Sequence, residues 1–239
     1  MRKREGMKKR RSRILAWLLA CFMVLSVIQG TGWGSLTVQA EEEVNSPAIL
    51  QVGGDFVINN GKVEKTEGTG WSYDADTNTL TLKNADLGHE VISYDGGVLN
   101  LQVDGENTIG PIDAENSDAA YITGIENGTD KAKLYCEGSI SVDALTINNI
   151  EINVDIDIDK VGSDRRTVSL ENVKLYVKGH IDANTISCSG SQINTAERVS
   201  VWGSLNCVDS EIRAGKIDFS SIKGTYTTSL LRTPTIMLR

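Results

Sequence analysis

Several residue types are scarce in this 239-residue chain, and each scarcity excludes a class of protein. Aromatic residues make up 5% of it, and it holds three prolines, four cysteines and two histidines. The histidines, His89 and His180, stand in unrelated contexts, without the Ser/His/Asp or Cys/His arrangement of a nucleophilic enzyme. No two cysteines form a CxxC pair, so a structural zinc site is not expected. No helical periodicity follows residue 40, which argues against a helical fold.

Basic residues are also scarce once the first 40 residues are set aside. The whole chain has 24 Lys+Arg and 32 Asp+Glu, a formal net charge of −8. Residues 1–40 hold eight of the basic residues and one acid, so 24 − 8 = 16 basic and 32 − 1 = 31 acidic residues remain, a net charge of −15. Residues 41–239 are too acidic to neutralise phosphates, which excludes a nucleic-acid partner. The same negative charge disfavours unaided binding of other polyanions.

Residues 1–40 predict a secretory signal peptide. Residues 1–13 are basic, residues 14–28 are apolar without interruption, and "TVQA" precedes "EEEVN", so cleavage is expected after Ala40. A run of 15 apolar residues is short for a spanning helix, which needs about 20. We therefore expect the mature protein to be secreted or associated with the cell surface, and to meet a membrane only through the signal before cleavage. A retained anchor and a lipoprotein modified at Cys21 are less favoured alternatives.

The body of the chain contains an internal repeat. Five segments share one order: apolar, small polar, apolar, any residue, a turn residue, small or branched, any residue, apolar. The segments are "LTLKNADL" (80–87), "LTINNIEI" (145–152), "VSLENVKL" (168–175), "ISCSGSQI" (186–193) and "LNCVDSEI" (205–212). The turn residues are Asn84, Asn149, Asn172, Gly190 and Asp209. These residue types tolerate the left-handed backbone conformation, which bends the chain sharply between two short strands.

The spacing of these turns predicts the fold class. Successive turn residues are 65, 23, 18 and 19 positions apart, and 65 is about three intervals of the same size. Short strands that meet at a left-handed corner once per interval predict an all-β, right-handed, single-stranded parallel β-helix with coils about 4.8 Å apart. A β-sandwich is the main alternative, because it also uses short strands with frequent turns.

A second set of segments aligns on glycines. The glycines are Gly105, Gly138, Gly179 and Gly203. Ahead of the repeat, residues 70–82 indicate a hairpin with Trp71 and Tyr73 on its first strand and a turn at residues 75–78. Because the open apolar end of a solenoid must be covered, we expect an N-terminal β-hairpin cap over residues 41–84 and the β-helix over residues 85–239.

The segment "EINVDIDIDK" (151–160) carries an acidic row. Strand alternation directs four of its residues inward: Ile152, Val154, Ile156 and Ile158. It leaves Asp155, Asp157 and Asp159 on one outer face. Such a row could hold calcium, which takes about six to eight oxygen ligands, if a neighbouring coil supplied more of them.

A solvated face is the favoured alternative for this row. A coil of 23 residues places Asp155 beside Lys178 and Asp157 beside His180, which gives ordinary cross-strand charge pairs.

The outward aromatic residues are the candidate carbohydrate-binding residues. In the glycine-aligned segments Tyr135 and Tyr176 hold equivalent outward positions, and Trp202 lies one outward step along. If these coils stack near one another, the three rings form a flat platform of the kind that sugar C–H surfaces pack against. The alternative is that the rings pack under a loop or against another copy.

The three cysteines of the mature chain are expected in the core. Cys188 and Cys207 occupy the same inward position on successive coils, within reach of a disulfide. Packing as two small hydrophobic residues is favoured over a bond, because Ile147 and Leu170 hold the same position in other coils. Cys136 also falls at an inward position.

Three segments make the chain resemble a known group of proteins. They are "GWSYDADTNTLTLKNADL", "LNLQVDGENTIG" and "GIENGTDKAKLYCEGSISV". Over residues 50–145 the chain resembles secreted and surface proteins of Gram-positive anaerobes with a carbohydrate-binding β-helix domain related to the polygalacturonate-binding β-helices. The resemblance implies an exported, right-handed β-helix that binds polysaccharide, in some members with calcium.

The expected function is therefore non-catalytic polysaccharide binding, with a neutral ligand or an acidic one bridged by calcium. An adhesion solenoid with protein partners is the first alternative. A polysaccharide lyase or hydrolase, with Arg165 or Arg166 as a lyase base, is the second.

Overall fold

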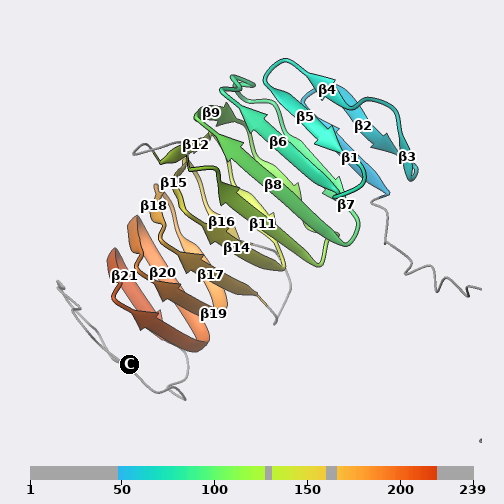
Figure 1. Cartoon of the computed structure of the whole chain (residues 1–239). Helices are drawn as coiled ribbons and strands as arrows, with labels where there is room; N and C mark the ends of the chain where they lie inside the picture. The colour runs from blue at the N-terminus through green and yellow to red at the C-terminus, as the bar shows by residue number, and fades with distance from the viewer. Residues whose placement is uncertain (1–47, 127–130, 160–165, 220–239) are drawn as a thin grey trace, which may run out of the picture. The chain divides into compact units, whose positions relative to one another are not determined.

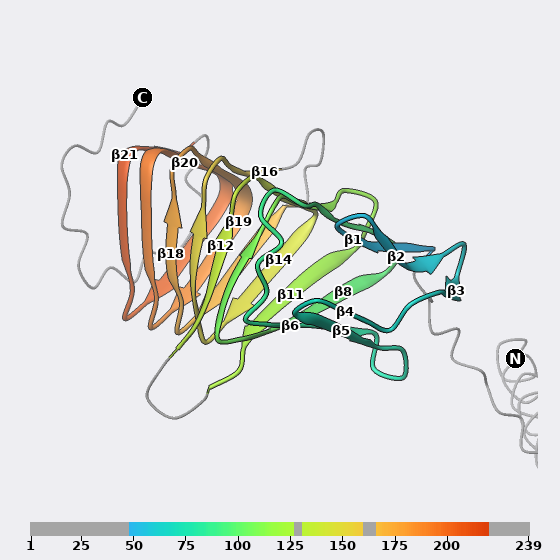
Figure 2. The same ribbon diagram turned by 90° about the horizontal axis from the view of Figure 1, so that it is seen from above.

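The computed structural model describes residues 48–126, 131–159 and 166–219. These residues form 21 strands and no helix, so the described chain has no helix long and apolar enough to cross a membrane. Parallel strands stack into a β-solenoid of about 6 turns (Figure 1). The strands follow one another along the stack in chain order, with β1 to β5 at one end and β21 at the other (Figure 2). The predicted signal peptide lies outside the described residues.

Each turn of the solenoid contributes one strand to each of three sheets, which we call A, B and C. Sheet A contains β1 (Ile49–Val52), β7 (Ile92–Asp95), β10 (Ile112–Ala114), β13 (Ile140–Val142) and β16 (Ile158–Asp159). Sheet B contains β5 (Trp71–Asp74), β6 (Thr79–Lys83), β8 (Val98–Asp104), β11 (Ala119–Gly124), β14 (Ala144–Asn148) and β17 (Thr167–Glu171). Sheet C contains β9 (Glu106–Ile109), β12 (Ala132–Cys136), β15 (Ile150–Val154) and β18 (Lys174–Val177).

The last three strands run through more than one sheet. They are β19 (Ile181–Ser189), β20 (Gln192–Val208) and β21 (Glu211–Phe219). In β20, residues 192–195 pair in sheet C, residues 198–201 in sheet A and residues 204–208 in sheet B. The chain therefore visits the sheets in the order B, C, A throughout.

Inward residues stack directly above one another. On sheet B, position 80 lies beside 101, then 122, 147, 170, 188 and 207. All but Cys207 are buried side chains of the single hydrophobic core. Stacked apolar rows bury the side chains that alternate along each strand, which is the main stabilisation of a solenoid.

The coils of this stack differ in length. Successive positions of the row differ by 21, 21, 25, 23, 18 and 19 along the chain. The separation of 65 between Asn84 and Asn149 does span three coils. Leu80 stacks in line with Ile147, whereas the sequence repeat aligns it with Leu145, so the first segment is displaced by two positions. A displacement of two keeps the same residues facing inward.

The predicted left-handed corners are confirmed. The φ angles of the five turn residues, Asn84, Asn149, Asn172, Gly190 and Asp209, lie between 47° and 57°. Four of them are residues with a side chain, and at the corner between sheets B and C the Asn172 amide donates to Asn149 Oδ1 at 3.2 Å. At Gly190 an added Cβ would lie 2.8 Å from Asn172 Oδ1. Two factors therefore favour glycine at this position: its positive φ and the close approach of the stacked asparagine.

The alignment of four glycines is wrong. Only Gly138 and Gly179 share a corner, the one between sheets C and A. Gly105 lies at the corner between sheets B and C, and Gly203 lies between sheets A and B. Glycine allows neighbouring coils to approach closely at these corners, because the Cβ of a larger residue would collide with the next coil. The colliding residue would be Pro111 at Gly138, Asp157 at Gly179 and Asn184 at Gly203.

The N-terminal hairpin is confirmed, but the covering structure is larger than a hairpin. Strands β5 and β6 pair antiparallel, with Trp71 opposite Leu82 and Tyr73 opposite Leu80. Strands β2 (Asp55–Asn59), β3 (Lys62–Val63) and β4 (Glu67–Gly68) add further antiparallel pairs, and β1 covers the first edge of sheet A. Strand β6 also pairs in parallel with β8, so it is the first solenoid strand of sheet B.

The preference for unbonded cysteines at the last coils is wrong. Cys188 and Cys207 are directly paired across β19 and β20, and their sulfur atoms form a disulfide with Cα atoms 4.6 Å apart. Direct stacking places the two Cα atoms within bonding range without displacing the backbone. Cys136 is a buried free thiol, and burial raises its pKa to about 11.

Candidate binding surfaces

Two of the three predicted sugar-binding aromatic residues share one row on sheet C. Tyr135 and Tyr176 each pair with Asn153, which lies between them, and Asn194 follows Tyr176. We call these four residues the tyrosine row. Each tyrosine is 37% exposed. Two strand spacings separate the phenol rings along the stack, about 9.6 Å, with an amide side chain in the gap.

A charged row lies beside the tyrosine row. Two positions earlier on the same strands, acids and bases alternate over the four residues Glu106, Lys133, Glu151 and Lys174, and Gln192 and Glu211 continue the row. Lys133 Nζ forms an ion pair with Glu106, and that hydrogen bond raises the pKa of Lys133. A groove of about 780 Å³ follows this row at the corner between sheets B and C. Opposite charges directly across neighbouring strands stabilise the sheet, and Lys133 and Glu106 are already partnered in this way.

The third predicted aromatic residue lies elsewhere. Trp202 stands at the corner between sheets A and B, where β20 has an irregular register opposite Ala183 and Thr185. Its ring centroid is 5.7 Å from the Arg166 guanidinium carbon. The structure therefore does not bring the three rings into one platform. Aligning segments on glycine placed Trp202 in the wrong sheet, because its glycine belongs to a different corner.

The arginines considered for a lyase do not offer an exposed base among the described residues. Arg166 is buried against Trp202, and its carbonyl accepts hydrogen bonds from the backbone amides of Asn184 and Thr185. Arg165 lies outside the described residues.

The acidic row of residues 151–160 is interrupted by a corner. Strand β15 ends at Val154 and β16 begins at Ile158. Ile156, predicted to point inward, is 52% exposed instead, because alternation stops where the chain turns from sheet C into sheet A. Asp155 lies before the corner and pairs with Lys178 Nζ at 2.6 Å, which confirms that expected pair.

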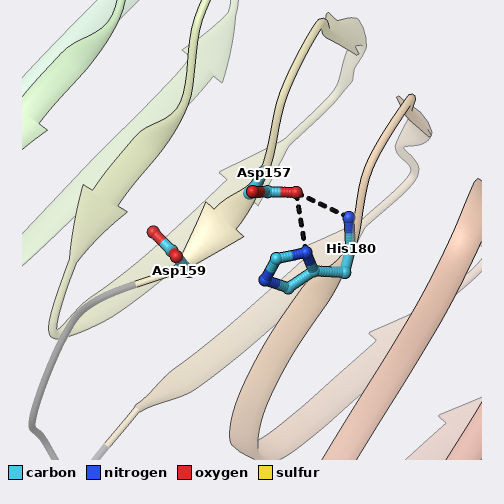
Figure 3. Close-up of side chains that lie close together, drawn as sticks. All are labelled: Asp157, Asp159 and His180. Carbon is cyan, nitrogen blue, oxygen red and sulfur yellow. Dashed lines mark hydrogen bonds and ion pairs between the residues drawn. The ribbon is translucent and has the colours of Figure 1, made fainter.

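The second expected pair is also present and belongs to a larger network. His180 Nδ1 lies 2.9 Å from Asp157 Oδ1, which also accepts the His180 backbone N–H at 2.7 Å (Figure 3). On the other side of the ring, His180 Nε2 lies 3.4 Å from Asp182, and Asp182 lies 3.5 Å from Arg198. Asp159 stands close by, so that Asp157, Asp159 and His180 could converge on one ion.

These residues fit calcium poorly. Calcium takes about six to eight oxygen ligands, whereas the group offers two carboxylates and an imidazole nitrogen. Asp155 is not a member of the group, and one oxygen of Asp157 is occupied by His180. The pairs present are those of a charge network across neighbouring coils.

Sheet B carries two outward rows that the search for aromatic and acidic residues missed. The first row contains Thr79, Asn100, Tyr121, Thr146, Ser169, Ser187 and Asn206. The second contains Thr81, Gln102, Thr123, Asn148, Glu171, Ser189 and Val208. Glu171 is the only charged residue in these two rows, and Tyr121 is 42% exposed. The signal was the small polar position in each repeat, which is occupied by Thr, Asn or Ser.

Comparison with known protein families, with curated proteins and with solved structures found no match to this chain.

Proposed function

We propose that the protein is exported and binds polysaccharide without catalysis, with the tyrosine row of sheet C as a contact surface. The observation that carries the proposal is the alternation of phenol and amide side chains along one straight row. Aromatic faces pack against the C–H surfaces of sugars, and amides exchange hydrogen bonds with sugar hydroxyls. A row that repeats at strand spacing suits an extended polymer better than a small molecule, which would need a concave pocket.

Two further features support export. The Cys188–Cys207 disulfide is of a kind that persists in oxidising compartments outside the cytosol. The basic and apolar pattern of residues 1–40 has the order of a secretory signal. Both agree with the family resemblance of residues 50–145.

A glycan-binding screen of the mature chain tests the proposal. We expect binding to at least one plant, host or bacterial polysaccharide, unchanged by a calcium chelator because the acidic group fits calcium poorly. The double variant Tyr135→Ala/Tyr176→Ala should weaken binding about fivefold or more, since each stacked ring contributes about 0.5–1.5 kcal/mol.

Phe56→Ala is the matched control. Phe56 is an exposed aromatic residue on β2, 45% accessible and away from sheet C, so its removal should leave glycan binding unchanged. Absence of binding to any glycan, with and without chelator, would contradict the proposal and favour a protein partner. Release of reducing ends or unsaturated products from pectic substrates would contradict its non-catalytic part.

A further inference from the structure

The two outward rows of sheet B named above differ in charge from outward rows of sheets A and C, and charge returns only at the next outward position, where Lys83 pairs with Asp104. Glu171 is the one charged residue in the two rows, whereas charged residues make up 23% of the chain as a whole. On sheet C the two rows described above and their continuation contain six charges in 12 positions, with Thr108 and Arg213 as the end residues. Outward positions are where charge is normally placed, so its near-absence over seven consecutive strands sets this surface apart.

Several polar groups on the two outward rows of sheet B have no side-chain partner among the described residues. No side-chain hydrogen bond within the described chain engages the hydroxyls of Tyr121 and Thr146 or the amide of Asn148. The acids Asp182 on sheet A and Asp104 at the end of β8, outside these two rows, are held in ion pairs with Arg198 and Lys83. These donors and acceptors of sheet B therefore remain available to water or to a ligand.

One aromatic ring stands in the middle of this surface. Tyr121 lies in the first row between Asn100 on β8 and Thr146 on β14, which are its direct neighbours on the two adjacent strands. Thr123 follows two residues later on the same face of β11. A half-exposed ring surrounded by hydroxyl and amide groups offers one apolar contact and many weak hydrogen bonds. Strands β6 and β8 of this sheet face the viewer in Figure 1.

We propose that sheet B is a second binding surface, occupied by an uncharged polysaccharide that packs a sugar face on Tyr121 and hydrogen-bonds to the flanking hydroxyl and amide rows. The choice of an uncharged occupant follows from complementarity. An acidic polymer finds no cation on these rows and meets the repulsion of an acidic body, while a basic polymer finds a single carboxylate, Glu171. The inference rests on the proposed function and narrows its ligand to a neutral glycan.

Pull-down of the mature chain with insoluble neutral polysaccharides tests the inference, using cellulose, chitin and a β-1,3-glucan beside soluble polygalacturonate with calcium. We expect depletion by at least one neutral polymer, and an affinity that changes less than twofold between about 0.05 and 0.5 M NaCl, since no ion pair is involved. Tyr121→Ala should weaken that binding about twofold to tenfold. Thr146→Lys, which buries an unpaired charge under the ligand, should abolish it.

Ser141→Lys is the matched control. Ser141 is an outward residue on sheet A, so the same charge is added to a different surface. Thermal unfolding of each variant separates lost binding from lost folding. The inference is overturned if the sheet B variants bind as the unmodified chain does, if Ser141→Lys is equally impaired, if only polygalacturonate binds, or if the sheet B variants instead dissociate a dimer. Loss in Tyr135→Ala/Tyr176→Ala alone would leave the proposed function standing without this second surface.

Discussion

Sheets A and B show how one repeat can give two surfaces of opposite character. The central outward row of sheet A reads Ser93, Asp113, Ser141 and Asp159, and then Asp182, Ser200 and Asp218, so four of seven residues are acidic. The first outward row of sheet B has no acid at all. Because parallel strands stack in register, each outward position of the repeat becomes a continuous row, and the charge of the body is sorted by sheet.

This sorting explains why net charge alone says little about the ligand. The acidic surplus of the mature body suggests repulsion of any polyanion. Sheet C nevertheless carries a row in which acids and bases alternate, and the two outward rows of sheet B described above carry one charge, Glu171. A bound ligand contacts the side chains of one row and not the average surface of the molecule. The charge of that row, and not the net charge of the chain, therefore decides which ligand it favours.

The largest expected effect concerns the disulfide inside sheet B. Cys188→Ser/Cys207→Ser removes the only covalent tie between coils in the described residues, across a separation of 19 residues. Loop-closure entropy predicts a loss of about 3 kcal/mol in the free energy of unfolding. Urea denaturation measures it. A loss under about 0.5 kcal/mol would show that stacking alone holds the last coils.

A left-handed corner should show the next largest effect. Asn172→Val places a β-branched residue at a φ of 54° and removes the side-chain hydrogen bond to Asn149 Oδ1. The left-handed backbone conformation alone should cost about 1–2 kcal/mol of the free energy of unfolding. Asn172→Gly keeps the backbone conformation and should cost less. Equal losses for valine and glycine, measured by thermal unfolding, would mean that the stacked amide and not the backbone is what the corner needs.

Alkaline pH should loosen the cap end of sheet B. Burial raises the pKa of Tyr73 to about 12 and also raises that of Tyr94, and Tyr73 donates a hydrogen bond to Asn78 Oδ1 at 2.8 Å. The unfolded chain loses a tyrosine proton near pH 10, whereas folded Tyr73 keeps it. The stabilisation is therefore complete below pH 10 and is lost as the pH rises toward 12. Unfolding followed across this range should show a smaller decline in Tyr73→Phe, and an identical decline would contradict the assignment.

The smallest effects separate the charged row of sheet C from the uncharged rows of sheet B. Lys133→Glu places three acids in succession, beside Glu106 and Glu151, and should lower the Tm more at low salt than at high salt. Glu171→Gln on sheet B removes a charge with no residue of opposite sign above or below it in its row, since Asn148 and Ser189 are its neighbours. Its Tm should stay unchanged at either salt concentration. A salt-dependent shift there would mean that sheet B is not electrostatically isolated.

The corners and the register were predictable because they depend on the residue type at each turn and on the number of residues between successive turns. A residue that must adopt a positive φ restricts its type to Asn, Asp or Gly, and Asn149 and Asn172 display this directly. The separation between these two asparagines is the length of one coil, and the same step along the chain leads from Asp155 to Lys178.

The aromatic platform was not predictable in the same way. Glycine occupies three different corners for one steric reason, so alignment on Gly179 and Gly203 joined segments from different sheets. The unequal coil lengths then concealed the error, since no constant period exposed it. Ile156 shows a related limit: alternation predicts direction within a strand and carries no information about where that strand ends.

The unequal coil lengths have a consequence for how this architecture can change. The shortest and the longest coils carry the same outward rows, so additional residues are accommodated at the corners. An insertion inside a strand would reverse every later side chain in that strand. Gain or loss of a whole coil, however, would lengthen or shorten each row by about 4.8 Å and leave its chemistry intact. The length of polymer that the solenoid can span is thus adjustable independently of the kind of polymer it selects.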